Sequence, residues 1–421
     1  MYKKTTLKNG LRIITVPDKE AETVSIVILV KTGSKYETKE ISGISHFLEH
    51  MLFKGTEKFK KPKDVAKFLD KVGGEFNAFT GEEYTGYYAK VRSEHLNDAF
   101  EWTSQIFLKS IIPLKEVEKE RGVIIEEINM YNDNPAMYID QLWKELLYGD
   151  QPAGWDIAGT KETVSKIKRK DILDYINSQY SSQNTIICIS GKFDEKKAIL
   201  KASKRFGSIK NKKVKDKVEV VESQKKPETL NHYRKIKQTN LGLGVRSFNL
   251  FHKDRYVCDI IACYLGGMMS SVLFEEVREK LGAAYYVRTY NATDTDTGCL
   301  VTFSGVDNNK LEKVIKVILK EYQKMKNVKI KEEDLKNTKE HIKGKISLRL
   351  EGSDEKAIFF ATQELLKNQI LTKEDIFKKI DKVTKEDVLR VSRNIFKDEN
   401  LNLVLIGENK DNNKFKKLLK L

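Results

Sequence analysis

The sequence has few cysteines and no apolar run long enough to cross a membrane. Its four cysteines, at positions 188, 258, 263 and 299, lack the spacing of a zinc-binding motif. Each lies among apolar residues, which predicts buried thiols in a reducing compartment rather than a disulfide framework. The first residues, MYKKTTLKNGLRIITVP, lead directly into a predicted strand without a signal peptide. Unless an import segment was removed beforehand, these absences predict a cytoplasmic protein without a membrane partner.

Acidic residues are also in deficit, and histidines number only six. The 77 lysines and arginines exceed the 61 aspartates and glutamates, which gives a net charge of +16. Such a charge would suit nucleic acids or acidic surfaces as partners. However, the basic residues are mostly lysines interspersed with glutamates, as in residues 310–345, and this pattern is typical of solvated helix surfaces. We therefore predict no nucleic-acid partner.

Two of the six histidines belong to the pentapeptide HFLEH, residues 46–50. On a helix, His46 and His50 lie one turn apart on the same face, where both imidazoles can bind one metal ion. Glu49 lies just before the second histidine, and its carboxylate can reach a water on that metal. The apolar residues around them predict that the opposite face packs in a core. The order H-x-x-E-H is a signature of zinc metallopeptidases of the inverted kind, the inverzincins.

A catalytic zinc ion needs a third protein ligand from elsewhere in the chain. Residues 115–132, KEVEKERGVIIEEINMYN, contain an apolar stripe and no proline, which predicts a helix. Glu120 and Glu127 are seven residues apart and share one face of it, whereas Glu126 points about 100° away from Glu127. By this geometry Glu127 is the candidate ligand, and Glu120 can lie behind it to orient the site or a proton. Without the histidine motif, each glutamate would be interpreted as solvated surface.

These motifs resemble those of the M16 (pitrilysin/insulinase) family of zinc metallopeptidases. In this chain 76 residues separate His50 from Glu127, which agrees with the family spacing. The longer segments HFLEHMLFKGTEKF and ERGVIIEEI are also similar to the family's motifs. The resemblance implies that His46, His50 and Glu127 bind one Zn²⁺ per chain. It gives the role of general base to Glu49 and a supporting role to Glu120, in a small two-domain chain similar to the β subunit of the mitochondrial processing peptidase.

A predicted hairpin follows the first motif. Residues 73–80, GGEFNAFT, and residues 84–91, YTGYYAKV, are predicted as two antiparallel strands. In the family, the matching strand is an edge that pairs with the backbone of the substrate, and the matching residues here are Asn77 and Ala78. A peptide bound by strand addition is held mainly through main-chain hydrogen bonds. The resemblance therefore implies broad specificity.

A third similar segment lies in the second half of the chain, at VREKLGAAYY, residues 277–286. In the family an arginine, and a tyrosine seven residues later, contact the substrate and stabilise the oxyanion. These roles fall on Arg278 and Tyr285, whose side chains both suit a developing negative charge. Just upstream, LGGMMSSVLF departs from the more glycine-rich family version at Met268 and Val272.

The chain also contains an internal repeat. Residues 166–191, KIKRKDILDYINSQYSSQNTIICISG, resemble residues 382–407, KVTKEDVLRVSRNIFKDENLNLVLIG, at a constant offset of 216. Both copies predict a helix, a polar turn and a buried strand that ends at glycine. The offset predicts two similar domains, 1–215 and 225–421, joined near the charged residues 210–228. Each is predicted to be α+β, with helices on a largely antiparallel sheet. The second half has no H-x-x-E-H motif, so we expect the metal only in the first domain.

The resemblance implies a zinc-dependent endopeptidase whose chamber needs two chains. Larger single-chain members enclose the active site with four such domains, and this chain has two. The metal of one chain would then face Arg278 and Tyr285 of the other, around peptides or extended unfolded segments. A homodimer is the simpler prediction because this chain has both sets of residues. The alternatives are a processing peptidase with a non-identical partner subunit and a non-catalytic scaffold subunit of the same fold.

Overall fold

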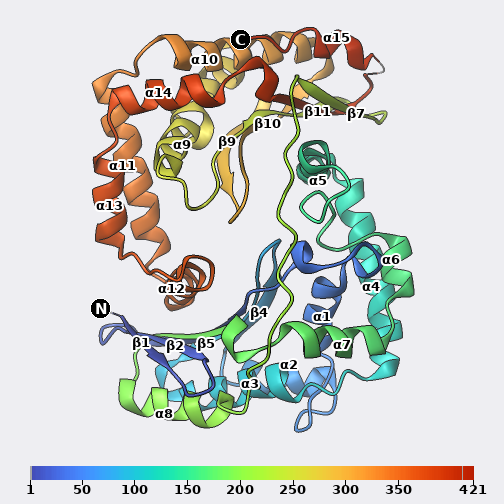
Figure 1. Cartoon of the computed structure of the whole chain (residues 1–421), viewed down its shortest axis with the longest axis vertical. Coiled ribbons are helices and arrows are strands. Elements are labelled where there is room, and N and C mark those ends of the chain that lie inside the picture. Colours follow the sequence, from blue (N-terminus) through green and yellow to red (C-terminus); the bar gives the residue numbers. More distant parts are fainter. Residues whose placement is uncertain (1, 410) are drawn as a thin grey trace. The chain divides into compact units, whose positions relative to one another are not determined.

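The chain folds into two compact units, shown in the computed structural model of Figure 1. The structure describes residues 2–409 and 411–421. Unit 1 comprises Met1–Asn129, Trp155–Val218 and Ser347–Leu371. Unit 2 comprises Met130–Gly154, Glu219–Ile346 and Thr372–Leu421. Each unit therefore takes one segment from the other half of the sequence, whereas the predicted domains, 1–215 and 225–421, are continuous.

Unit 1 is built on a six-stranded sheet with the strand order β1-β2-β6-β3-β5-β4. The β2–β6 pair is parallel, and the other neighbouring pairs are antiparallel. The central strand β3, TVSIVILV, is apolar on both faces because both faces of the sheet are covered. The strands are β1 Lys3–Thr6, β2 Arg12–Pro17, β3 Thr23–Val30, β4 Glu75–Thr80, β5 Thr85–Arg92 and β6 Thr185–Gly191.

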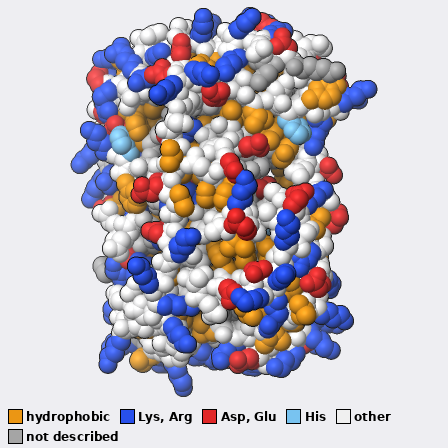
Figure 2. All heavy atoms as spheres, turned by 45° about the vertical axis from the view of Figure 1, so that its right-hand side comes forward, with side chains coloured by type: hydrophobic (Ala, Val, Ile, Leu, Met, Phe, Trp, Pro, Cys, Tyr) orange, Lys and Arg blue, Asp and Glu red, His pale blue; other side chains and the backbone are white. Residues whose placement is uncertain are grey.

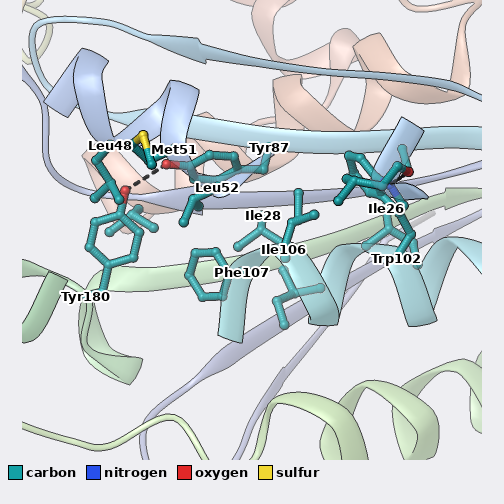
Figure 3. Packing of buried hydrophobic residues seen from close by; sticks show 14 of the residues in the cluster. Ile26, Ile28, Leu48, Met51, Leu52, Tyr87, Trp102, Ile106, Phe107 and Tyr180 are labelled. Atoms are coloured by element: carbon teal, nitrogen blue, oxygen red, sulfur yellow. Dashed lines mark hydrogen bonds between the residues drawn. The ribbon is translucent and has the colours of Figure 1, made fainter. Parts of the chain in front are cut away.

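Helices from the first half of the chain cover one face of this sheet. Figure 3 shows Leu48, Met51 and Leu52 of helix α1 beside Tyr87 of β5, whose hydroxyl is 2.8 Å from that of Tyr180. The helices are α1 Ile44–Leu52, α2 Pro62–Asp70, α3 Leu96–Lys109, α4 Leu114–Asp133, α6 Lys161–Lys166, α7 Arg169–Gln179 and α8 Glu195–Phe206, with 3₁₀ turns at Ser34–Tyr36, Lys39–Ile41, Ser93–His95 and Ser182–Asn184. The helix predicted over 115–132 is α4, which continues from unit 1 into unit 2.

The other face of the sheet is covered by α12, Ser353–Lys367, which comes from the second half of the chain. Its buried residues Ala357, Ala361 and Leu365 pack against apolar side chains of β2, β3 and β6. The almost fully buried carboxylate of Glu364 lies 3.1 Å from the ammonium of Lys4 and 3.3 Å from the guanidinium of Arg12. Apolar packing and ion pairs thus attach α12 to the strands of unit 1.

Unit 2 is built on a five-stranded sheet with the order β7-β11-β8-β10-β9, in which only the described pair β7–β11 is parallel. Helix α5, Pro135–Tyr148, comes from the first half of the chain and packs its Trp143 near Phe303 of β10. The strands are β7 Glu228–Tyr233, β8 Gln238–Arg246, β9 Ala284–Thr293, β10 Gly298–Asp307 and β11 Leu401–Gly407. The remaining helices are α9 Arg255–Ala262, α10 Leu311–Asn327, α11 Glu332–Arg349, α13 Lys373–Asp381, α14 Lys385–Ile395 and α15 Asn412–Lys416, with π-helical turns at Cys263–Gly267 and Phe274–Lys280 and 3₁₀ turns at Asn308–Lys310 and Asp398–Asn400.

The internal repeat corresponds to equivalent elements of the two units. Helix α7 and strand β6, shifted by 216 residues, coincide at both ends with helix α14 and strand β11. Each of these strands lies inside its sheet, between two neighbouring strands, and is buried throughout. The predicted α+β fold, with two similar halves and largely antiparallel sheets, is confirmed.

The basic residues lie on the surface among acidic ones, as the sequence pattern of lysines and glutamates indicated. Figure 2 shows lysine and arginine side chains intermingled with aspartate and glutamate over the face in view. In the described residues, some lysines of α10 and α11 also form ion pairs with glutamates on the same helix, such as Lys316–Glu312 and Lys343–Glu340. Among the described helices, none is long and apolar enough to cross a lipid bilayer.

Candidate metal centre

Helix α1 presents the H-x-x-E-H motif because its opposite side is anchored in the core. Phe47, Leu48 and Met51 are fully buried, so His46, Glu49 and His50 lie on the remaining face. The helix starts after Gly43, whose φ of 94° suits a residue without a side chain. The backbone N–H groups of Gly43 and Ser45 are held by the carboxylate of Glu37, which lies in the preceding turn.

Glu37 is a buried cap that the sequence did not reveal. Its two carboxylate oxygens accept hydrogen bonds from the backbone N–H groups of Gly43, at 2.7 Å, and Ser45, at 2.8 Å. Burial raises the pKa of Glu37 to about 8, although these hydrogen bonds oppose the shift. The N-terminal N–H groups of a helix have no partner within the helix. Glu37 satisfies two of them and thereby fixes where α1 begins.

Helix α4 supplies the two glutamates that the sequence predicted to share a face. One carboxylate oxygen of Glu127 lies 3.7 Å from Nε2 of His46 and 3.4 Å from Nε2 of His50. One ligand atom from each of these three residues falls within 4.8 Å of the others. The structure thus brings His46, His50 and Glu127 together, as predicted, and leaves Glu126 exposed on another side of the helix.

These three residues fit a zinc ion. Zinc bonds to imidazole nitrogen and carboxylate oxygen are about 2.0–2.1 Å long, so two ligands in a tetrahedral site are separated by about 3.3 Å. The observed separations of 3.4 and 3.7 Å from Glu127 to the two histidines are close to that value. All three side chains keep some exposure, which leaves access for a fourth, non-protein ligand. The ligand set is two nitrogens and one oxygen, as in catalytic rather than structural zinc sites.

Glu120 lies behind the second histidine rather than behind Glu127. Its carboxylate is 3.2 Å from Nδ1 of His50, and its other oxygen is 2.8 Å from Nζ of Lys54. Burial would raise the pKa of Glu120, but the hydrogen bonds from His50 and Lys54 outweigh burial and lower it. An acceptor at Nδ1 directs Nε2 toward the metal and orients the ring. Lys54 was missed from the sequence, although it lies four residues after His50, just beyond the end of α1.

The two imidazoles have opposite environments. Burial lowers the pKa of His46 to about 4, and the nearby His50 adds to this effect. For His50, burial is outweighed by hydrogen bonds with Glu120 and Glu127, which raise its pKa to about 9. Zinc binds neutral imidazole, so the raised pKa of His50 predicts that metal binding there releases a proton. Among the described residues, Nδ1 of His46 has no hydrogen-bond partner.

Glu49 is held by a residue of strand β4. The hydroxyl of Thr80 donates a hydrogen bond of 2.5 Å to Oε2 of Glu49. Burial raises the pKa of Glu49, which the Thr80 hydrogen bond opposes. A carboxylate with a raised pKa is suited to take up a proton near neutral pH. Thr80 was not identified from the sequence as a neighbour of the site.

Strand β4 lies at the edge of the sheet of unit 1. It pairs in antiparallel register with β5, so Asn77 lies opposite Tyr88 and Ala78 opposite Tyr87. The predicted hairpin is therefore present. Asn77 is exposed, and its side-chain oxygen accepts from the N–H of Ala78 at 2.9 Å. Within the described sheet β4 has a neighbour on one side, and an edge of this kind can accept another strand.

In unit 2 the structure brings Arg278 and Tyr285 together. The guanidinium of Arg278 lies 4.7 Å from the ring centre of Phe274 and 5.3 Å from that of Tyr285. Tyr285 is 79% exposed, whereas Tyr286 is half-buried and donates to the side-chain oxygen of Asn240. Burial raises the pKa of Tyr286 to about 12. The more accessible phenol of the two is that of Tyr285, the residue at the seven-residue spacing from Arg278.

The loop before this pair joins two π-helical turns. Met269 is 76% exposed, and Gly266 packs so closely on Thr289 that a Cβ atom there would lie 2.3 Å from its hydroxyl oxygen. Gly266 is therefore required by packing, and the chain tolerates Met268 two positions later because that position is more open. Turns of the π type are rare and often occur at functional sites.

Two histidines and a glutamate lie around one point, and Glu49 lies on the same helix as both histidines; this donor set suits a zinc ion. The chain matches the model of insulinase, peptidase family M16, over residues 12–161, which include the metal centre. The model of the peptidase M16 inactive domain matches residues 166–342, where no H-x-x-E-H motif occurs. The chain belongs to peptidase family M16, and its resemblance to a small two-domain member is confirmed.

Known proteins are similar to this chain over almost its whole length. An uncharacterized zinc protease of Bacillus subtilis (strain 168) is 34% identical over 95% of this chain and 97% of its own length. An uncharacterized zinc protease of Streptomyces coelicolor is 30% identical over 97% of this chain and 90% of its own. The crystal structure of a protease from Helicobacter pylori has a TM-score of 0.90 and 26% identity, covering 97% of this chain and 99% of that chain. A chain of complex III2 from Candida albicans, at 18% identity and a TM-score of 0.86 over both full lengths, shares the fold.

Proposed function

We propose that the protein is a zinc-dependent endopeptidase, in which Glu49 is the general base. The observation that carries this proposal is the convergence of His46, His50 and Glu127, with Glu49 on the same helix as both histidines. Membership of the M16 family and the names of its relatives support peptidase activity.

The three converging side chains would hold one zinc ion per chain. When bound, zinc supplies Lewis acidity, which polarises a scissile carbonyl and makes water acidic enough to react at neutral pH. The carboxylate of Glu49 accepts a proton from the attacking water, whose oxygen forms a bond to the carbonyl carbon. As the C–N bond breaks, Glu49 returns the proton to the leaving amine nitrogen. Glu120 acts through His50, because its carboxylate holds the Nδ1 side of that ring.

The substrate would be a peptide or an extended unfolded segment. The open edge of β4 supports this, because a peptide can add to it as a further antiparallel strand along Asn77 and Ala78. Main-chain hydrogen bonds then carry most of the recognition, and the side-chain requirements are loose. Folded proteins offer few unpaired extended segments, so they would be poor substrates.

Two chains would be needed for a complete active site. We infer a homodimer in which Arg278 and Tyr285 of one chain stabilise the oxyanion formed at the metal centre of its partner. The exposure of Tyr285 and the stacking of Arg278 against it support a preformed pair of donors. If the partner is a non-identical subunit, the protein is a processing peptidase. If neither the homodimer nor such a heterodimer cleaves peptides, the protein is a scaffold subunit of the same fold.

The function is tested with a quenched fluorescent peptide library, with chelator and with zinc added back. We expect cleavage that chelator abolishes and zinc restores. Glu49→Gln should keep one zinc per chain and lose turnover, and His50→Ala should lose both. Glu126→Gln is the matched control, since this exposed glutamate adjoins Glu127 and should change neither quantity. Chelator-insensitive cleavage, or turnover by zinc-loaded Glu49→Gln, would contradict the proposal.

A further inference from the structure

Thr80 joins the proposed substrate strand to the proposed base. It is the last residue of β4, and its hydroxyl donates the 2.5 Å hydrogen bond to Oε2 of Glu49. The backbone of Thr80 pairs with Thr85 across the hairpin, whose turn is closed by a 2.9 Å hydrogen bond from Gly81 N–H to Tyr84 carbonyl. The position of this hydroxyl is therefore set by the sheet.

The threonine side chain itself restricts the direction of the hydroxyl. Two heavy atoms on Cβ leave threonine with few χ1 rotamers, unlike serine or a longer side chain. Glu49 has three rotatable bonds, and its partly buried carboxylate needs a fixed partner to keep one orientation. A hydrogen bond to a charged group is stronger than one between neutral groups, and it is enough to select one rotamer from several.

A carboxylate has two oxygens, and only one can accept the proton of the attacking water. With Oε2 held by Thr80, Oε1 is the oxygen left for proton transfer. We propose that Thr80 is a positioning residue that fixes the carboxylate of Glu49 for proton transfer. Because Thr80 belongs to β4, the strand that aligns the peptide also aligns the base. This inference rests on the proposed function and adds a residue to it.

The test compares Thr80→Val, which keeps the shape and removes the hydroxyl, with Thr80→Ser, which keeps the hydroxyl. For Thr80→Val we expect kcat to fall about 10- to 100-fold, from loss of a hydrogen bond to a charged group. We expect KM, bound zinc and Tm to stay near the wild-type values. Thr80→Ser should recover most of the lost kcat. In a Glu49→Gln background, Thr80→Val should leave the Kd of an uncleaved peptide unchanged.

The matched control is Thr85→Val on the facing strand. The buried hydroxyl of Thr85 donates to the backbone carbonyl of Thr32 at 2.9 Å, away from Glu49. This variant should lower Tm and leave kcat unchanged, which is the opposite of Thr80→Val. Wild-type kcat in Thr80→Val, or equal losses in the valine and serine variants, would overturn the role of Thr80 alone. If Thr80→Val fails to fold, Thr80→Ala tests the same loss. A wild-type protein without chelator-sensitive cleavage would instead overturn the proposed function, and this inference with it.

Discussion

Lys54 should control how tightly the metal centre binds zinc, although it is not a ligand. Its ammonium is 2.8 Å from one oxygen of Glu120, and the other oxygen is 3.2 Å from Nδ1 of His50. The Glu120 side chain is only 4% exposed, so water cannot readily replace a lost partner. Lys54→Met keeps an unbranched side chain and removes the charge. The carboxylate of Glu120 then loses the cation that holds it against the imidazole.

The size of the effect follows from these contacts. Hydrogen bonds to charged groups contribute about 1.5–3 kcal/mol, and about 1.4 kcal/mol corresponds to a tenfold change in an equilibrium constant. Changes to residues behind a metal ligand typically weaken metal binding by about 10- to 100-fold. Because Glu120 stays in place on α4 in this variant, we expect the lower limit, a zinc Kd raised about tenfold.

The assay is a competition titration with a chromophoric zinc chelator at fixed pH and ionic strength. Lys58→Met is the control, because Lys58 forms a similar ion pair with Glu101, at 3.1 Å, that touches no ligand. Exposed ion pairs of this kind contribute little, so its zinc Kd should equal that of the wild type. Equal zinc affinities of the wild type and Lys54→Met would refute the reasoning, and so would equal losses in the two variants.

Two further predictions concern stability. The pKa of Glu37 is about 8 in the folded chain against an ordinary 4.5, so its contribution is complete below about pH 4.5 and is lost as the pH rises toward 8. Urea unfolding at pH 5 and pH 8 should therefore show the wild type losing up to a few kcal/mol relative to Glu37→Gln, and parallel pH curves would contradict this. Glu364→Ala should lower the free energy of unfolding by about 2 kcal/mol, since it leaves Arg12 and Lys4 without their buried partner. Glu355→Ala on the same helix removes an exposed pair with Arg349 and should cost less than about 0.5 kcal/mol, so equal losses would rule out the special role of Glu364.

The candidate metal ligands could be predicted because their spacing in the sequence places them on one face of a helix. His46 and His50 share a helical face by periodicity alone, and so do Glu120 and Glu127, while the family motifs join the two helices. Lys54, Thr80 and Glu37 could not be predicted in this way. Each acts through a tertiary contact: Lys54 with Glu120, Thr80 with Glu49, and Glu37 with the start of α1. Isolated lysines, threonines and glutamates are common on helix and strand surfaces.

The repeat could likewise be predicted, down to the ends of α7 and α14, because its offset is constant. The sequence could not predict that α5, from the first half of the chain, packs on the sheet of unit 2, or that α12, from the second half, packs on the sheet of unit 1. Their apolar faces show in the sequence that each packs on something, but no pattern within a helix identifies the sheet that it covers. The sheet itself carries the corresponding signal, since β3 is apolar on both faces and so requires a cover on each side.

This exchange makes the two halves of the chain mutually dependent for folding. A fragment ending before α12 would expose the apolar face formed by Ile14, Val27 and Leu29, and would be prone to aggregate. Separately produced halves should consequently reconstitute one another when mixed, as a split protein does. The same geometry bears on ancestry. If the repeat arose by gene duplication, each half-length ancestor would have packed its equivalent of α5 or α12 on the sheet of an identical copy. A domain-swapped dimer is then the natural precursor of the present chain.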